Sequence, residues 1–296
     1  MREWIRRTLF RMLSPTLWAA IRDFYRQYEG EKERIKRREQ WALAHYQIQL
    51  KNIKAWSIKH TEETNLYYDI TPLNKSYLAE SISLVTGHGT DKINELFHEI
   101  ESDSEIRSHF SEKLSNLRWG KDIYIHYGRR LGWYAFVRII KPKIIIETGV
   151  DLGVGSCLLS AALLRNAAEG APGRYYGTDI RSEAGYLFGG KYATTGELII
   201  GDSIQSLKKF DLAIDLFIND SDHTSNYEYN EYLTIQEKLS KTAIILGDNS
   251  ESCDSLLKFS KKTGRSFLFF QEQPLNHWYP GGGIGISFHP HRSSRR

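Results

Sequence analysis

The stretch Ile144-Ile-Ile-Glu-Thr-Gly-Val-Asp-Leu-Gly-Val-Gly-Ser156 decides how the second half of the chain folds. It opens with a β-branched run that stops at Glu147, and glycines follow at positions 149, 153 and 155. An apolar segment, Leu158 to Leu164, comes next. This order predicts a buried parallel strand, a tight turn and a helix, the start of a nucleotide-binding α/β unit. The glycines let a ligand approach the backbone, and the N–H groups at the helix start favour an anionic group such as a carboxylate.

The stretch differs from the G-x-G-x-x-G pattern of dinucleotide-binding proteins. An acid stands two residues before the first glycine, and the spacing to the second glycine is wider. In this form the stretch resembles motif I of the class I S-adenosylmethionine (SAM) methyltransferases. The resemblance implies that Glu147, Gly149, Gly153 and Ser156 lie against SAM. The alternative is a strand-to-helix turn that binds no ligand.

Four further segments read as strands with polar residues at their carboxyl ends. They are Gly173 to Ile180 with Asp179, Glu197 to Ser203 with Asp202, Ile214 to His223 with Asp220, and Thr242 to Asn249 with Asp248 and Asn249. Open parallel sheets bind ligands at this edge. An acid at the tip of the second strand, Asp179, is placed to accept hydrogen bonds from ribose hydroxyls. The resemblance further implies that Asp202 contacts the adenine and that Asp220 belongs to the cofactor site.

The resemblance extends over residues 128 to 289. Two late segments, Ser266 to Phe270 and Gly283 to Phe288, predict the sixth and seventh strands. The resemblance implies that the seventh runs antiparallel, beside the sixth. We therefore expect an α/β fold in residues 126–290, the Rossmann-like seven-stranded sheet of a class I methyltransferase. Within that class the chain resembles the O-methyltransferases that act on small molecules and sugars.

Methyl transfer to a hydroxyl needs either a general base or a divalent cation that lowers the pKa of the hydroxyl. Asp220, Asp248 and Asn249 offer oxygen ligands at neighbouring strand ends, which suits Mg²⁺ or a similar cation. The trio resembles the metal site of catechol- and caffeoyl-CoA-type O-methyltransferases. The simpler alternative is that these residues cap the helices that follow.

Two histidines are candidate bases. His223 forms an Asp-x-x-His pattern with Asp220 that resembles macrolide-sugar O-methyltransferases and the cephalosporin hydroxylase-like family, while a structural role beside the adenine is the alternative. His277 lies in the loop before the last strand. We expect Glu228 to be a solvated or packing acid. Two other functions stay open: a metal-dependent, hydroxylase-like enzyme on the same fold, and a non-catalytic SAM-binding scaffold.

Composition narrows the class of protein. The hydrophobic content of 41% and the aromatic content of 12% support a core, and the net charge of +4 is mild. Its basic excess lies at the ends, unlike the basic stripe of a nucleic-acid-binding domain. Cys157 and Cys253 fit a reduced protein, with Cys157 packed in a helix. Without a long apolar run, and with arginines throughout the first residues, we expect no membrane span and no signal peptide, and a cytoplasmic protein.

Residues 1–125 read as a helical extension. Met1 to Tyr28 is amphipathic, with a break before Pro15, and the charged run that follows continues as helix. Three short helices are predicted at Asn74 to Thr86, Asp91 to Glu101 and Glu105 to Leu117. The extension carries Trp4, Trp18, Trp41 and Trp56. We expect it to bury them in a homodimer more readily than at a membrane surface. Residues 291–296 are expected to be a basic tail.

Overall fold

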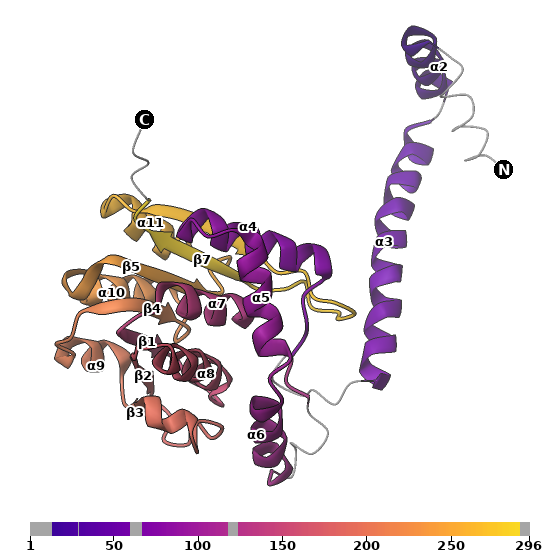
Figure 1. Cartoon of the computed structure of the whole chain (residues 1–296). Helices are drawn as coiled ribbons and strands as arrows, with labels where there is room; N and C mark the ends of the chain where they lie inside the picture. Colours follow the sequence, from indigo (N-terminus) through magenta and orange to yellow (C-terminus); the bar gives the residue numbers. More distant parts are fainter. Residues whose placement is uncertain (1–13, 29, 60–66, 118–123, 291–296) are drawn as a thin grey trace. The chain divides into compact units, whose positions relative to one another are not determined.

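The computed structural model of the chain describes residues 14–28, 30–59, 67–117 and 124–290 (Figure 1). Its internal contacts divide the chain into two compact units, Met1–Lys59 and His60–Arg296. The predicted basic tail and Trp4 lie outside the described residues.

The first unit contains two helices, α2 (Pro15–Tyr28) and α3 (Glu31–Lys59). α2 starts at Pro15 as predicted, because the fixed φ of proline suits the first helical position. α3 buries none of its side chains and exposes a series of large apolar ones, Trp41, Leu43, Tyr46, Ile48 and Leu50. Across the described ranges, every helix is too short or too polar to cross a membrane.

The second unit is built on a seven-stranded sheet (Figure 1). Its strands are β1 (Ile144–Thr148), β2 (Arg174–Asp179), β3 (Gly196–Ile200), β4 (Ile214–Asn219), β5 (Leu239–Asp248), β6 (Ser266–Gln271) and β7 (Gly283–Phe288). They lie in the order β3-β2-β1-β4-β5-β7-β6. Strands β1 to β5 are parallel, and β7 is antiparallel to both β5 and β6. This confirms the predicted fold class.

Helices cover both faces of the sheet, because successive side chains of a buried strand point to opposite faces. Ile145 belongs to the core shared with α4 (Pro72–Thr86), α5 (Thr90–Glu101), α6 (Ser104–Ser115), α7 (Arg130–Ile140) and α8 (Val154–Ala168). Its neighbour Ile146 belongs to the core on the other face, shared with α9 (Ser203–Lys209), α10 (Ser225–Ile235) and α11 (Ser255–Lys262). Two short 3₁₀ helices, Tyr192–Thr195 and Gln236–Lys238, complete the fold.

Helices α4 to α6 pack with the sheet although they precede residue 125. Buried side chains of all three helices lie in the same core as α7 and α8. Asn74 also ties α4 to the end of β6, since its side chain donates to the carbonyl of Gln271 at 2.9 Å and accepts from the N–H of Gln273 at 2.8 Å. Residue 125 therefore marks the change from helices alone to alternating strands and helices, while the compact unit begins at His60.

Candidate active site

The turn after β1 brings the ends of two strands into contact. Gly149 has a φ of +81°, and a Cβ at this position would lie 1.9 Å from the carbonyl oxygen of Asp220, which follows β4. The N–H of Asp220 donates to the carbonyl of Thr148 at 2.8 Å. Gly153, with a φ of +91°, then begins α8. Both glycines therefore occupy positions that a larger residue would strain or block.

Glu147 ends this strand in a buried polar cluster. The hydroxyl groups of Tyr175 and Ser156 both donate to its carboxylate, the latter at 3.0 Å. Burial raises the pKa of Glu147 to about 7, against the lowering effect of these two hydrogen bonds. The Ser156 hydroxyl is itself fully buried. Ser156 therefore acts on the site through Glu147, whereas Glu147 lines a cavity directly.

Asp179, at the tip of β2, holds the same turn from the other side. One carboxylate oxygen accepts from the N–H groups of Val150 at 3.0 Å and Asp151 at 2.9 Å, and the other accepts from that of Arg181 at 2.9 Å. Burial raises the pKa of Asp179, but these hydrogen bonds outweigh it and the pKa lies below its usual value. Asp179 is therefore an oriented, ionised acceptor.

Asp202 takes two roles after β3. It caps α9, since one carboxylate oxygen accepts from the N–H of Gln205 at 2.8 Å. Its other oxygen accepts from the hydroxyl of Tyr227 at 2.9 Å. Asp202 and Tyr227 thereby form one wall of a cavity at the carboxyl edge of the sheet.

Two adjoining cavities open at this edge. Cavity A, of about 530 Å³, is lined by Gly149, Asp179, Asp202 and Tyr227 among others. Cavity B, of about 210 Å³, lies against the turn after β1 and the first residues of α8, under three tyrosines, Tyr67, Tyr68 and Tyr279. The two cavities share five lining residues, Arg129, Arg130, Asp151, Asp220 and Asn249. Four of the seven predicted cofactor residues (Gly149, Asp179, Asp202 and Asp220) line cavity A, and Glu147 lines cavity B.

Arg129 lies at the centre of this region. Its guanidinium donates two hydrogen bonds to the two carboxylate oxygens of Asp248 and a third, of 2.8 Å, to Glu272. Glu272 also accepts from the hydroxyl of Tyr68 at 2.7 Å. Burial raises the pKa of Asp248, but Arg129 outweighs it and the pKa falls below its usual value. Burial and the neighbouring Asp248 raise the pKa of Asp220 well above its usual value.

His223 belongs to a chain of polar contacts. Its Nδ1 lies 3.2 Å from a carboxylate oxygen of Glu228, and its Nε2 lies 3.0 Å from the amide nitrogen of Asn249 and 3.6 Å from Asp220. Because an amide nitrogen only donates, Nε2 accepts and Nδ1 carries the proton toward Glu228. The hydrogen bond with Glu228 raises the pKa of His223, and burial opposes this effect. His223 thus presents a lone pair on Nε2, as a base requires.

Glu228 agrees with the second of the two alternatives expected from the sequence, an acid that packs within the domain. It is 1% exposed, and its second carboxylate oxygen lies 3.2 Å from the thiol of Cys253. A buried carboxylate behind a histidine fixes the tautomer of the ring and stabilises its protonated form. Glu228 therefore belongs to the candidate site.

Two of the three predicted metal ligands, Asp220 and Asp248, lie together with His223, and the ligand atoms of these three residues are within 4.8 Å of one another. Both carboxylate oxygens of Asp248, however, accept from Arg129. The amide nitrogen of Asn249 faces His223, and that contact leaves the amide oxygen as the atom that would bind a cation. A divalent cation at Asp220, Asp248 and Asn249 stays a prediction, and it would compete with Arg129 for Asp248. Capping does not account for Asp248, since α11 begins only at Ser255.

His277 lies in the loop between β6 and β7. Its Nδ1 accepts from the N–H of Tyr279 at 3.0 Å, and its ring centroid is 5.3 Å from that of Tyr68. Among the described residues, Tyr68 and Tyr279 line cavity B and His277 does not. A catalytic role for His277 stays a prediction.

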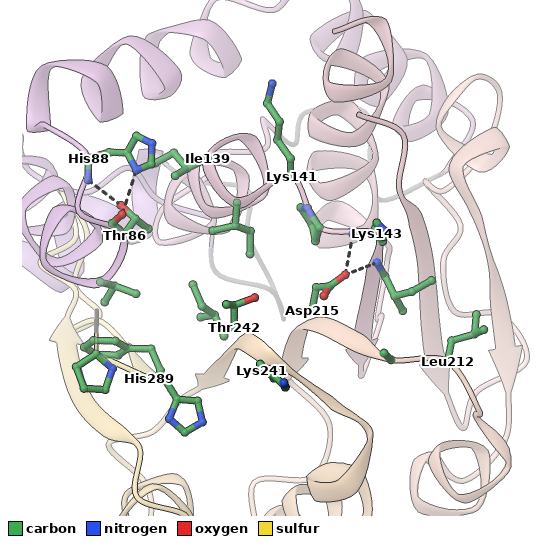
Figure 2. Close-up of a pocket in the computed structure, with 18 residues that line it drawn as sticks. Thr86, His88, Ile139, Lys141, Lys143, Leu212, Asp215, Lys241, Thr242 and His289 are labelled. Carbon is green, nitrogen blue, oxygen red and sulfur yellow. Dashed lines mark hydrogen bonds between the residues drawn. The ribbon is translucent and has the colours of Figure 1, made fainter. Parts of the chain in front are cut away.

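A cavity larger than A and B lies elsewhere in the second unit. Cavity C, of about 1010 Å³, opens at the amino ends of β1, β4 and β5 and has a largely apolar lining, with Ile139 and Leu212 beside Lys141, Lys143 and Lys241 (Figure 2). Its carboxylate, Asp215, is occupied by the N–H groups of Lys143 at 2.8 Å and Ile144 at 3.2 Å (Figure 2). A choice by cavity size alone would place the site in cavity C, at the amino edge of the sheet. The acidic side chains converge at the carboxyl edge instead, so we assign the site to cavities A and B.

The comparisons with known proteins concern the same part of the chain. Residues 146–250 match the family model of a methyltransferase domain. This match covers the region from β1 to the end of β5. This region is therefore similar to methyltransferase domains, as the resemblance implies. A search of curated proteins finds no match.

Several solved structures are similar to the chain at low identity. The O-methyltransferase TomG from Streptomyces achromogenes, involved in tomaymycin synthesis and solved with SAM, is 14% identical over 63% of this chain and 90% of its own, with a TM-score of 0.46. An O-methyltransferase described as putative, from Klebsiella pneumoniae, is 14% identical over 74% of this chain and 99% of its own, with a TM-score of 0.47. The methyltransferase PaMTH1 from Podospora anserina, solved with S-adenosylhomocysteine, is 18% identical over 63% and 88%, with a TM-score of 0.44.

Proposed function

We propose that the protein transfers the methyl group of SAM to a hydroxyl of a small molecule or sugar. The observation that carries this proposal is the convergence of the polar tips of β1 to β5 on two adjoining cavities. Asp179, an ionised acceptor, lines cavity A. His223, with the buried carboxylate of Glu228 behind it, contacts Asn249 and Asp220, which line both cavities. Such convergence, rather than cavity size, marks a binding site.

Cavity A suits the adenosine part of SAM. The carboxylate of Asp179 is fixed at its edge and accepts from the ribose hydroxyls, and Asp202 with Tyr227 contacts the adenine. The methionyl part then passes Gly149 and Asp151 into cavity B. The sulfonium and the ammonium of SAM are cations, and the carboxylates along this path, Glu147, Asp151 and Asp220, stabilise them.

His223 activates the acceptor hydroxyl. The hydroxyl takes the place of Asn249 at Nε2, and His223 accepts its proton as the oxygen attacks the methyl carbon. The O–CH₃ bond forms while the S–CH₃ bond breaks, so the sulfonium becomes a neutral thioether. Glu228 stabilises the imidazolium that results.

A divalent cation is the other way to activate a hydroxyl. Asp220, Asp248 and Asn249 would hold one only if Asp248 gave up a hydrogen bond from Arg129. Arg129 already supplies a fixed positive charge beside Asp248, so the arrangement favours His223 over a cation. A chelator separates the two routes, because only the second depends on a metal.

The proposed function is tested directly by incubating the protein with SAM that carries an isotope-labelled methyl group and a panel of phenols, sugars and glycosides. We expect mass spectrometry to show the label in one acceptor class and S-adenosylhomocysteine in equal amount. Hydroxylated products, or SAM binding without transfer to any acceptor, would favour the hydroxylase-like or the scaffold alternative.

We also propose that the first unit joins two copies of the chain in the cytoplasm. The support is α3, a helix without a buried residue that exposes Trp41 at 74% and Tyr46 at 65%. Apolar side chains in such number favour burial against a partner. Light scattering should then show a dimer for the whole chain and a monomer when residues 1–59 are removed. A dimer that survives the truncation would place the interface elsewhere, and binding to anionic vesicles would favour a membrane.

A further inference from the structure

Arg130 lines both cavities, where its charge acts to lower the pKa of Glu147, Asp220 and Asp248, but one of its buried donors has no acceptor among the described residues. It is the first residue of α7 and lines cavities A and B. Its Nε is buried and, in the ranges that the structure describes, has no hydrogen-bond partner. Its guanidinium carbon lies 5.4 Å from the ring centre of Trp133, which holds the side chain beside α7.

The other two arginines of this site are paired within the chain. Arg129 binds Asp248 and Glu272. Arg181 binds Asp151 at 2.7 Å and lies 3.5 Å from Asp179. A buried donor left without an acceptor is costly, so native proteins pair nearly all of them. The missing acceptor of Arg130 is therefore expected from a ligand.

The ligand group that fits Arg130 is a carboxylate. A planar guanidinium binds carboxylates with two parallel hydrogen bonds. Most other charged side chains that line cavity B are acids, Glu147, Asp151 and Asp220, which repel an anion. Across the same cavity, Val154 and Gly155 belong to the first turn of α8, whose cap residue Gly153 offers no side-chain acceptor to the free N–H groups there.

We propose that Arg130 binds the carboxylate of the methionyl group of SAM, between its guanidinium and the first turn of α8. The inference rests on the proposed function, since it names a contact within the same cofactor site. The acids of cavity B then face the ammonium and the sulfonium, and Arg130 selects the end of the molecule that carries the negative charge. Arg130 thus distinguishes SAM from adenosine compounds that lack the carboxylate.

Isothermal titration calorimetry with three ligands tests this contact. SAM carries the carboxylate, decarboxylated SAM lacks it, and 5′-methylthioadenosine lacks the whole amino-acid part. In Arg130→Gln we expect SAM to bind about 10- to 100-fold more weakly. The other two ligands should change by less than about threefold, since they never reach the guanidinium. Arg130→Lys, which keeps the charge but loses the planar fork, should fall between.

The matched control is Arg174→Gln, an exposed arginine at the start of β2 on the opposite edge of the sheet, which should leave all three affinities unchanged. Circular dichroism melting curves should show that every variant folds like the natural protein. If Arg130→Gln weakens all three ligands alike, the carboxylate contact is refuted while the proposed function stands. If the natural protein itself binds none of the three, the proposed function fails and the inference with it.

Discussion

The two edges of one sheet offer two very different cavities. At the amino edge, cavity C has about 1010 Å³, an apolar floor and a carboxylate, Asp215, whose partners are backbone N–H groups of β1 and the residue before it. At the carboxyl edge, cavities A and B have about 530 and 210 Å³ and collect the carboxylates of five strand ends. The parallel arrangement of β1 to β5 creates this asymmetry, since every strand end and the turn that follows it reach the same edge.

The difference shows which property identifies a site. A large apolar cavity can form at a sheet edge that helices leave uncovered, and it needs no charged side chains. A cluster of buried acids and arginines destabilises the fold unless the charges pair with one another or bind a ligand. Substitutions at the carboxyl edge should therefore affect cofactor binding or turnover, and substitutions at the amino edge should not.

The largest effect is expected for His223→Ala. Loss of the base should lower turnover by about 10²- to 10⁴-fold, while SAM affinity stays within about threefold because the proposed role of the ring concerns the acceptor hydroxyl and not SAM. Chelator should change neither quantity. Activity that survives the substitution and disappears in chelator would give the role to a metal at Asp220 and Asp248, and would mean that Arg129 releases Asp248.

A smaller effect is expected for Asp179→Ala. Loss of the oriented acceptor should weaken SAM binding by about 10- to 100-fold, because ribose hydroxyls and the N–H groups of the turn lose their partner. Lys241→Ala, at the rim of cavity C, is the matched change on the amino edge and should leave calorimetric SAM affinity unaltered. An equal loss in both variants would remove the functional difference between the edges.

Glu147→Gln should stabilise the fold while it impairs the cofactor site. Burial raises the pKa of Glu147 to about 7, so between its unfolded pKa and this value the folded state binds the extra proton and stability falls as pH rises. The glutamine of the variant does not ionise, so its stability does not fall with pH for this reason. In urea denaturation, the gain in free energy of unfolding caused by Glu147→Gln should be about 1–3 kcal/mol larger at pH 8 than at pH 4. An equal effect at both pH values would show that Glu147 ionises normally.

The smallest change is expected in the pH profile of Glu228→Gln. The hydrogen bond to Glu228 raises the pKa of His223, and the base acts only in its neutral form, so activity rises as pH increases through that pKa. Without the carboxylate the pKa of His223 falls, and the acid limb of kcat should move to lower pH. A limb that stays in place would show that another group controls it.

The sequence predicts the strands and their tips because the signals are local. A β-branched run followed by glycine or an acid specifies where each parallel strand ends, and the parallel order then gathers Asp179, Asp202, Asp220 and Asp248 at one edge. Helices α4, α5 and α6 follow from apolar spacing and turn residues in the same way.

The pairing of the charges could not be predicted, because it depends on contacts between distant positions. Arg129 stands in a plain Gly-Arg-Arg sequence, and its partners Asp248 and Glu272 lie 119 and 143 residues away. Glu228 lies on α10, and His223 precedes this helix by two residues. The residue at which α10 begins therefore determines that the carboxylate of Glu228 faces the imidazole of His223. The metal prediction depended on acids being free, which sequence spacing does not report.

The contact between Gly149 and Asp220 also has a consequence for the order in which parts of the site form during folding. The turn after β1 is held by Asp179 of β2 on one side and lies against the carbonyl of Asp220, after β4, on the other, so a growing chain that ends before residue 214 holds the turn from one side only. Pairing of β1 with β4 across a long crossover is a slow, non-local event. Once it occurs, the glycine turn and the segment that leads to His223 are fixed together. A ligand of this turn can therefore protect the finished domain from unfolding, but during synthesis it meets an incomplete site until β4 has formed.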